Sequence, residues 1–413
     1  MANKISLYGC FIKGLVIFNM LTVRRHYIFL CLLICNTCLF SVYSKQETAA
    51  QYSSEKNTLL LFSIMQDLLP LVLDEQQFND IKNKDIIGNN LDKLNNLFVE
   101  LKEHSDIAPI TFNISSSVLS RHIKAAKKAF ANSEYVYARY LLKSLPAACI
   151  SYYNRDEYLH KKLPTINKSL FVSEFDLAEF YYMFRNYKQA LVTYETFINK
   201  NINQANKGNV AQNIQTSLER ILAIYLHGYK NPGLAFDVLQ NYQKKFIFPE
   251  YINIYITEWL KGLELVEDTF GKSVKIQKVL TFNELKKYIS EYFHESETLP
   301  SSFIIPKSDQ MFYLMLSGYL NDYLYTNPKK EEIPALLYWS SLCDRALNYH
   351  DNISVADLYL KECIVTNPKS AYAKKCLSEY DEYMTLSYSG IDGDLPHYIS
   401  KEIKFLHDLV YID

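Results

Sequence analysis

The stretch FDLAEFYYMFRNYKQALVTYETF (175–197) has two alanines twelve residues apart, Ala178 in its first half and Ala190 in its second. Around them, apolar and aromatic residues such as Leu177, Tyr181 and Tyr194 recur at the spacing of a helix with one buried face. Small residues mark the places where two neighbouring helices approach most closely. The stretch therefore predicts two antiparallel helices that touch at Ala178 and Ala190.

Two further stretches repeat this arrangement. In LERILAIYLHGYKNPGLAFDVLQNY (218–242), Ala223 and Ala235 are again twelve residues apart, and Asn231-Pro232-Gly233 breaks the helical pattern between them. The third stretch, YWSSLCDRALNYHDNISVADLYLKECIVTNP (338–368), fits with one extra residue. Its corresponding small residues are Cys343 and Ala356, thirteen residues apart.

These offsets resemble those of the tetratricopeptide repeat, and the resemblance covers three irregularly spaced hairpins within residues 165–413. It implies an α-solenoid of antiparallel helical hairpins, with a concave groove that suits a protein or an extended peptide. Residues 250–333 are expected to continue the solenoid with divergent helices, one of which holds Trp259. Residues 370–390 and 398–410 are expected to form capping helices at its end.

Residues 45–160 predict a second helical block. Apolar residues recur at helical spacing in four segments, 58–78, 89–104, 115–131 and 134–145. The third segment is expected to begin at a serine cap, Ser116 or Ser117. Four helices of this length and order are typical of an up-down four-helix bundle.

The fourth segment runs into LPAACISYYNRDEY (145–158), which has the spacing of a haem-attachment motif but only its first residue. Cys149, Tyr152 and Tyr153 stand where Cys-x-x-Cys-His has its two cysteines and its histidine. A tyrosine cannot form a thioether to haem, and a phenol with a pKa of about 10 is a poor iron ligand.

Over residues 55–160 the chain thus resembles the cytochrome c-prime family, a four-helix bundle with its haem motif near the end of the last helix. The resemblance implies that Cys149 would form a thioether, and that Tyr153 would stand at the axial ligand. It also implies that Met65 stands where some relatives supply a methionine ligand. We expect a vestigial bundle without haem. An unrelated bundle with a chance cysteine and a site that still binds haem are the two alternatives.

The first 44 residues predict a secretory signal peptide. They contain four basic residues and no Asp or Glu, and Arg24-Arg25-His26 precede the apolar run YIFLCLLICNTCLF (27–40) and a small residue, Ser44. The apolar run is shorter than the roughly 20 residues of a membrane-spanning helix. A membrane anchor is the alternative. We expect the mature chain to begin at Lys45 and to be exported, to the periplasm or cell envelope of a bacterium.

Four cysteines follow this leader, Cys149, Cys343, Cys363 and Cys376. Their spacing is not that of a disulfide-rich scaffold. A Cys343–Cys363 bond would require the third hairpin to slip in register, because the two residues lie at different levels along their helices. We expect four free thiols, with neither Cys343–Cys363 nor Cys363–Cys376 bridged.

Composition and motifs narrow the function. Gly and Pro number only 11 and 12 in 413 residues, which favours long helices. The whole chain has a net charge of −1 and its first 44 residues carry +4, so the remainder carries −5. This charge, without a basic cluster, argues against nucleic acid as the main partner. The sequence lacks GxxxxGK[ST], GxGxxG and HExxH motifs, and its nine histidines show no metal-ligand spacing. We expect no catalytic residues, no metal and no cofactor, with haem as the only candidate.

Together these patterns predict an exported all-α protein made of a signal peptide (1–44), a four-helix bundle (45–160) and a tetratricopeptide-like solenoid (165–413). The expected function is that of a non-catalytic scaffold that binds a protein or an extended peptide in the groove of its repeats. The alternative function is electron transfer or gas sensing through haem.

Overall fold

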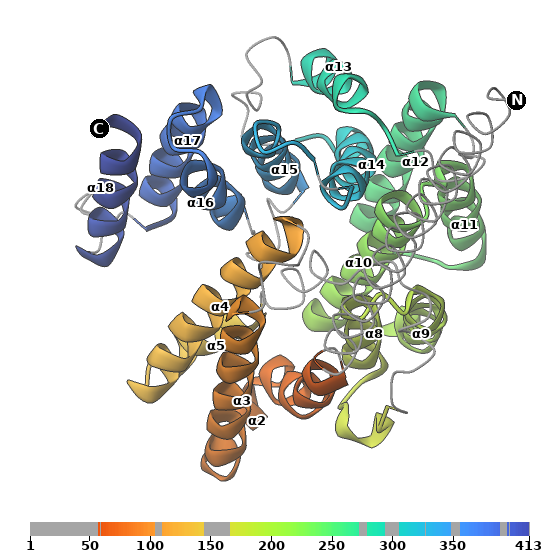
Figure 1. The fold of residues 1–413 in the computed structure, drawn as a ribbon. Coiled ribbons are helices and arrows are strands. Elements are labelled where there is room, and N and C mark those ends of the chain that lie inside the picture. The colour runs from red at the N-terminus through yellow and green to blue at the C-terminus, as the bar shows by residue number, and fades with distance from the viewer. Residues whose placement is uncertain are drawn as a thin grey trace, which may run out of the picture. The chain divides into compact units, whose positions relative to one another are not determined.

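The structure is a computed structural model of the chain. By its internal contacts the chain divides into two compact units, Met1–Leu60 and Leu61–Asp413. The structure describes residues 57, 59–103, 110–143, 166–271, 279–293, 305–326, 328–347, 356–388, 395 and 397–412. Every element among these residues is a helix (Figure 1), so the predicted all-α class is confirmed for them.

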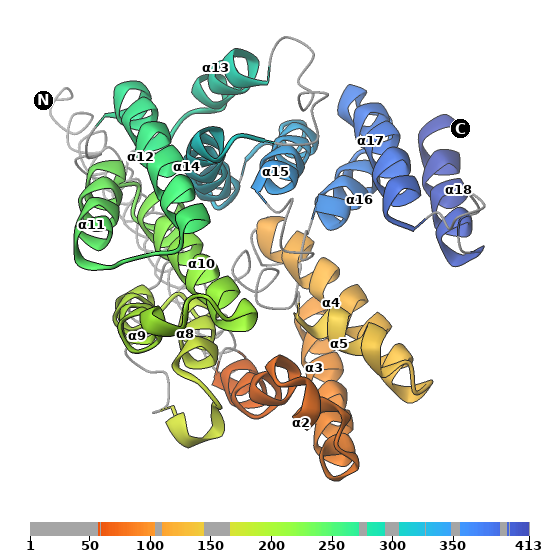
Figure 2. The same cartoon turned by 180° about the vertical axis from the view of Figure 1, so that it is seen from behind.

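The first group of helices packs around one apolar core, whose first residue is Leu61. These helices are a helix over residues 59–73, α2 (Glu75–Asn79), the 3-10 turn η1 (Ile81–Asn83), α3 (Lys84–Glu103), α4 (Ile110–Ala131) and α5 (Tyr135–Lys143). α4 packs against both α3 and α5, as Figures 1 and 2 show from opposite sides. Residues at helical spacing, among them Leu94, Phe98 and Ile123, form the buried cluster between them.

The start of α4 corrects one expectation. The helix begins at Ile110, so Ser116 and Ser117 lie inside it and the predicted serine cap is wrong. Ile110 and Ile114 continue the four-residue apolar spacing backwards from Val118. Serine costs only a few tenths of a kcal/mol relative to alanine within a helix, so the longer apolar pattern prevails over the local polar run.

The helix over residues 59–73 ends on a side chain from α5. Arg139 donates from Nε to the Val72 carbonyl (2.9 Å) and from Nη2 to the Leu73 carbonyl (3.0 Å), and its Nη1 lies 2.8 Å from Glu75 Oε2. The last carbonyls of a helix have no hydrogen-bond donor within the helix. The guanidinium of Arg139 donates to two of them. Asp74 then caps α2 by accepting hydrogen bonds from the next turn.

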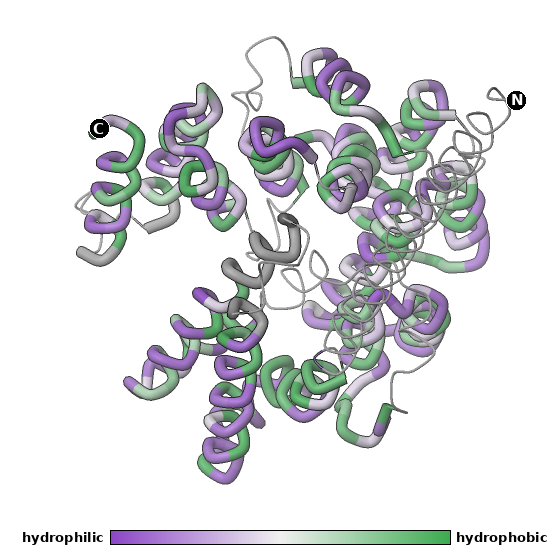
Figure 3. The backbone as a smooth tube through the Cα atoms, viewed as in Figure 1, coloured by the Kyte–Doolittle hydropathy of each residue, from purple (hydrophilic) through white to green (hydrophobic). Residues whose placement is uncertain are grey.

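A longer series of helices follows, in which successive elements pack on one another. They are η3 (Lys168–Leu170), α8 (Glu174–Met183), α9 (Tyr187–Asn201), η4 (Ile202–Gln204), α10 (Gly208–Ala223), the π-helical turn η5 (Ile224–Gly228), α11 (Pro232–Lys245), α12 (Glu250–Phe270), α13 (Phe282–Tyr292), α14 (Lys307–Leu324), α15 (Ile333–Leu347), α16 (Ala356–Thr366), α17 (Ala371–Tyr388) and α18 (His397–Tyr411). Close pairs include α8 with α9, α12 with α14, and α15 with α16. Hydrophobic and hydrophilic residues alternate along most of these helices (Figure 3), as expected for helices with one buried side.

Two of the helical turns share one design. Arg185 and Lys230 both have a φ of 53°, a left-handed conformation that is uncommon outside glycine. Each is followed by an asparagine whose side chain caps the next helix, Asn186 for α9 and Asn231 for α11. The buried alanines Ala190 and Ala235 come four residues after these caps.

The apolar core consists of two clusters that meet at α8. Phe62 of the first helix lies 5.4 Å from Phe180 and 4.8 Å from Phe184 between ring centroids. Phe180 of α8 and Phe184, which directly follows this helix, both belong to the cluster formed by the first group of helices. The predicted domain boundary falls among residues 144–165, which lie outside the described residues, and stays a prediction.

Candidate functional site

One side of α12 is fixed in the core. Its buried residues follow a four–three spacing, which keeps them on one side of a helix. They are Ile252, Ile256, Trp259, Leu263 and Val266, each 0% exposed. α12 packs against α11 and α14, and at Gly262 the approach of α14 is so close that an added Cβ atom would lie 2.8 Å from Ser308 Cα. Tight packing along this side therefore fixes the position of α12 in the fold.

The opposite side of α12 carries exposed apolar side chains. Tyr251, Ile254 and Leu265 are 40%, 55% and 43% exposed. They belong to a row at successive steps of three, four, three, four and three residues, the spacing of a coiled-coil seam. This outer row of α12 consists of Tyr251, Ile254, Glu258, Lys261, Leu265 and Asp268.

Carboxylates dominate the charge of this side. Glu258 pairs with Lys261 at 2.7 Å. Glu250, Glu264 and Asp268 have no ion-pair partner within the part of the chain that the structure describes. Four carboxylates and one ammonium group thus share this side of the helix, so it is negative at neutral pH.

An open groove lies at the beginning of the outer row. It has a volume of about 530 Å³ and is lined by Phe248, Glu250, Asn253, Ile254, Thr257 and Glu258. The Asn253 amide donates to the Phe248 carbonyl, and the Thr257 hydroxyl donates to the Asn253 carbonyl, both at 2.9 Å. Both side chains thus form hydrogen bonds within the protein. The groove therefore offers a ligand apolar surface and carboxylates.

A polar cluster lies where η5 meets α14. The Ser317 hydroxyl donates to the Leu314 carbonyl (2.8 Å), so at the 3.0 Å contact with His227 Nδ1 it is the imidazole that donates. His227 Nε2 then accepts from the Asn321 amide at 3.4 Å. Activation of a serine requires the opposite direction, with a ring nitrogen that accepts the hydroxyl proton. These hydrogen bonds join η5 to α14.

Lys230 adds a buried ion pair to the same cluster. Its side chain is 3% exposed, and its Nζ lies 3.4 Å from Asp322 Oδ2 and donates to the His227 carbonyl. Gly318 leaves room for it, because a Cβ atom there would lie 2.6 Å from the lysine Nζ. A buried ammonium is tolerated when it is paired and hydrogen-bonded in this way. These contacts join the turn after η5 to α14.

Charged groups also join α16 to α4 and α18. Arg121 pairs with Glu362, and Lys361 pairs with Glu402. Burial raises the pKa of the Asp357 carboxyl to about 6, and the nearby carboxyl of Asp344 acts in the same direction. The two ion pairs thus connect three helices, and the raised pKa means that the Asp357 carboxyl on α16 keeps its proton to a higher pH than an ordinary aspartate does.

Of the three residues predicted for a haem site, the structure describes only Met65. Met65 is 1% exposed and lies in the apolar cluster of the first helices, the surroundings of a core methionine. Cys149 and Tyr153 lie outside the described residues. The haem-site assignment therefore stays a prediction.

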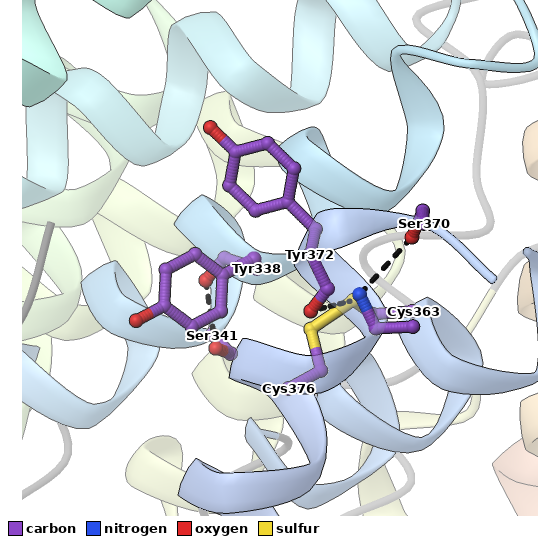
Figure 4. Close-up of a disulfide and its surroundings, with 7 residues drawn as sticks. Tyr338, Ser341, Cys363, Ser370, Tyr372 and Cys376 are labelled. Atoms are coloured by element: carbon purple, nitrogen blue, oxygen red, sulfur yellow. Dashed lines mark hydrogen bonds between the residues drawn. A yellow bond between two sulfur atoms is a disulfide. The ribbon is translucent and has the colours of Figure 1, made fainter. Parts of the chain in front are cut away.

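The expectation of four free thiols is wrong at two positions. Cys363 and Cys376 form a disulfide, with Cα atoms 6.3 Å apart (Figure 4). The turn between α16 and α17 is short, so α17 folds back along α16. Cys363 comes three residues before the end of α16 and Cys376 five residues after the start of α17, which brings them to similar levels. Cys343 is free and buried, as expected, and Cys149 lies outside the described residues.

Metal and membrane features can be assessed only where the structure describes the chain. There, no three His, Cys, Asp or Glu side chains gather in a way that could hold a metal ion. In the same ranges, no helix has both the length and the apolar character required to span a membrane.

Comparisons with known proteins give no match. No protein-family profile matches the chain, and no curated protein or solved structure matches it.

The outer row of α12 is a feature that the sequence prediction misses. The prediction places a helix around Trp259 but no binding surface on that helix. A signal existed in the apolar residues that occur on both sides of that helix.

Proposed function

We propose that this protein is a non-catalytic scaffold that binds a protein or peptide partner on the outer row of α12. The observation that carries the proposal is the line of exposed Tyr251, Ile254 and Leu265 on a helix whose other side is fixed in the core. Exposed apolar surface bordered by polar residues is typical of sites where proteins interact. A rigid helix also presents such a surface with little loss of conformational entropy on binding.

The proposal includes the finer architecture, an N-terminal four-helix bundle followed by a tetratricopeptide-like solenoid. The matching turns at Arg185-Asn186 and Lys230-Asn231 support repeated hairpins, as do the buried alanines that follow them. In a solenoid, each hairpin buries its sides against its neighbours and leaves other surfaces open for partners.

We place the mature protein outside the cytosol, in a bacterial periplasm or cell envelope. The basic and apolar leader of residues 1–44 supports this location. The Cys363–Cys376 disulfide supports it independently, because such bonds form and persist mainly in oxidising compartments.

Site-specific cross-linking tests the function. A photo-reactive phenylalanine analogue is placed at position 254 in the full chain, and a matched control carries it at position 192, where Val192 is 57% exposed on α9. Irradiation of the native cells should give a discrete protein adduct from position 254 and none from position 192. Absence of an adduct at 254, or equal labelling at both positions, would show that the outer row is not a binding surface.

Haem binding is the second candidate function, and the partial motif at Cys149 is the observation in its favour. Protein purified from a haem-replete host should show no Soret band and an unmodified mass at Cys149. A Soret band together with a haem adduct on Cys149 would establish the electron-transfer or gas-sensing alternative.

A further inference from the structure

We infer that the partner on the outer row of α12 is an amphipathic α-helix whose apolar side is bordered by lysine or arginine. This inference rests on the proposed function and adds the chemical class of the partner. It is argued from the spacing of the exposed side chains and from the sign of the charges around them.

The spacing selects a helix as the occupant. The outer row runs from Tyr251 to Asp268 with alternating steps of three and four residues, which over this span is about 25 Å of helix. Side chains at these steps form the knobs and holes into which a second helix packs. An extended peptide would gain less, because the backbone groups within α12 already bond to one another and offer no free edge for strand pairing.

The charges select a basic helix. Glu250, Glu264 and Asp268 border the row without an ion-pair partner within the described ranges, and Glu258 has only Lys261. Lysine and arginine side chains can cover apolar surface with their methylene stems and place their charges beside these carboxylates. Apolar contact at Tyr251, Ile254 and Leu265 then coexists with favourable electrostatics at the border.

The same charges disfavour two other occupants. In a two-fold dimer the same patch meets itself, so a second copy would bring four carboxylates against four carboxylates. An anionic membrane surface would likewise be repelled. A basic amphipathic helix is the occupant that satisfies both the apolar row and its acidic border.

The test uses three synthetic 18-residue helical peptides with the same leucine seam, flanked by lysine, by glutamine or by glutamate. Binding to the full chain is followed by fluorescence anisotropy of labelled peptide. The lysine peptide should bind at least about tenfold more tightly than the glutamine peptide, and the glutamate peptide should not bind. Raising the salt from 50 to 500 mM should weaken the lysine peptide several-fold and leave the glutamine peptide within about twofold.

Variants locate the site. Ile254→Ala should lower the affinity for the lysine peptide about tenfold. The variant lacks the part of the isoleucine side chain that the bound peptide would cover, and this apolar burial is lost. Glu264→Gln with Asp268→Asn should weaken it about fivefold and reduce its salt dependence. The controls are Val192→Ala on α9, which also shortens an exposed β-branched side chain to alanine, and Asp381→Asn with Glu382→Gln on α17, which removes the same two charges. Both should leave binding unchanged.

The outcomes separate this inference from the proposed function. Equal affinity for the three peptides, or loss of binding in the α9 and α17 controls to the same extent, would overturn the inference about a basic helix. If position 254 still gave its cross-link in cells, the proposed function would stand without it. Absence of that cross-link would remove the proposed function itself.

Discussion

The contact between α12 and α14 at Gly262 gives the sharpest prediction for stability. A Cβ atom added to Gly262 would overlap the Ser308 carbonyl oxygen and would lie 2.8 Å from both the carbonyl carbon and the Cα of Ser308. All three atoms belong to the backbone in the first turn of α14, so no side-chain rotation can relieve the overlap. The Gly262→Ala variant must separate the two helices locally.

The expected cost follows from the kind of atoms that collide. Overfilling a packed core forces shifts of side chains and backbone that cost typically about 1–3 kcal/mol. Here a backbone has to move, so we expect a loss at the upper end, about 3 kcal/mol. The intrinsic gain of alanine over glycine within a helix, roughly 1 kcal/mol, is too small to offset it. Ser308→Ala should not rescue the variant, because the clash is with the main chain.

Two glycines elsewhere provide matched controls for the same substitution. A Cβ atom at Gly208 would meet nothing within 4 Å, and at Gly88 it would make only an ordinary contact of 3.8 Å with Phe130. Gly208→Ala and Gly88→Ala should therefore be neutral or stabilising by up to about 1 kcal/mol. Urea denaturation followed by circular dichroism compares the three variants. A Gly262→Ala midpoint equal to that of the wild type or of the controls would refute the reasoning.

Three further predictions concern buried charge, the disulfide and pH. Lys230→Met should cost about 3–5 kcal/mol because it leaves a buried aspartate without its cation, whereas Lys245→Met, which breaks an exposed pair, should cost at most about 1 kcal/mol in the same denaturation assay. Replacing Cys363 and Cys376 together by serine should lower the free energy of unfolding by about 3 kcal/mol, since the bond closes a short loop in the unfolded chain; equal midpoints with and without reductant in the wild type would contradict this. The carboxyl of Asp357 has a folded-state pKa of about 6 against an ordinary value of 3.8, so between these values the folded state holds the proton more tightly than the unfolded one. The stability of the wild type should therefore fall relative to Asp357→Asn as the pH rises through this window, and parallel pH profiles for the two proteins would contradict the assignment.

The sequence predicts the helices well where local signals agree. The breaker at Asn231-Pro232-Gly233 ends one helix and begins another in the structure, with Asn231 as the cap of α11 and Pro232 in its first turn. The helix around Trp259 is found as α12. In both places the apolar period and the turn residues point to the same boundary, so no information from distant residues is needed.

Features that depend on distant residues are not predicted. Arg139 closes the end of a helix 67 positions earlier in the chain, and no local pattern marks it as a cap. The π-helical turn at Ile224–Gly228 is likewise tied to α14 through His227 and Ser317, which are 90 positions apart. The Cys363–Cys376 bond depends on the return angle of α17, which the spacing of the cysteines does not determine.

The two sides of α12 differ in how far the sequence alone predicts their environment. The buried row of Ile252, Ile256, Trp259, Leu263 and Val266 is apolar at every position, whereas the outer row interrupts Tyr251, Ile254 and Leu265 with charged residues. The sequence could therefore have ranked the first row as the one that faces the core. It could not have told whether another helix covers the second row, because a helix apolar on two sides is equally compatible with burial between two layers. Among the described residues, the exposure of Ile254 and Leu265 identifies the second row as an open surface. The carboxylates beside them are the reason why we propose a basic partner for it.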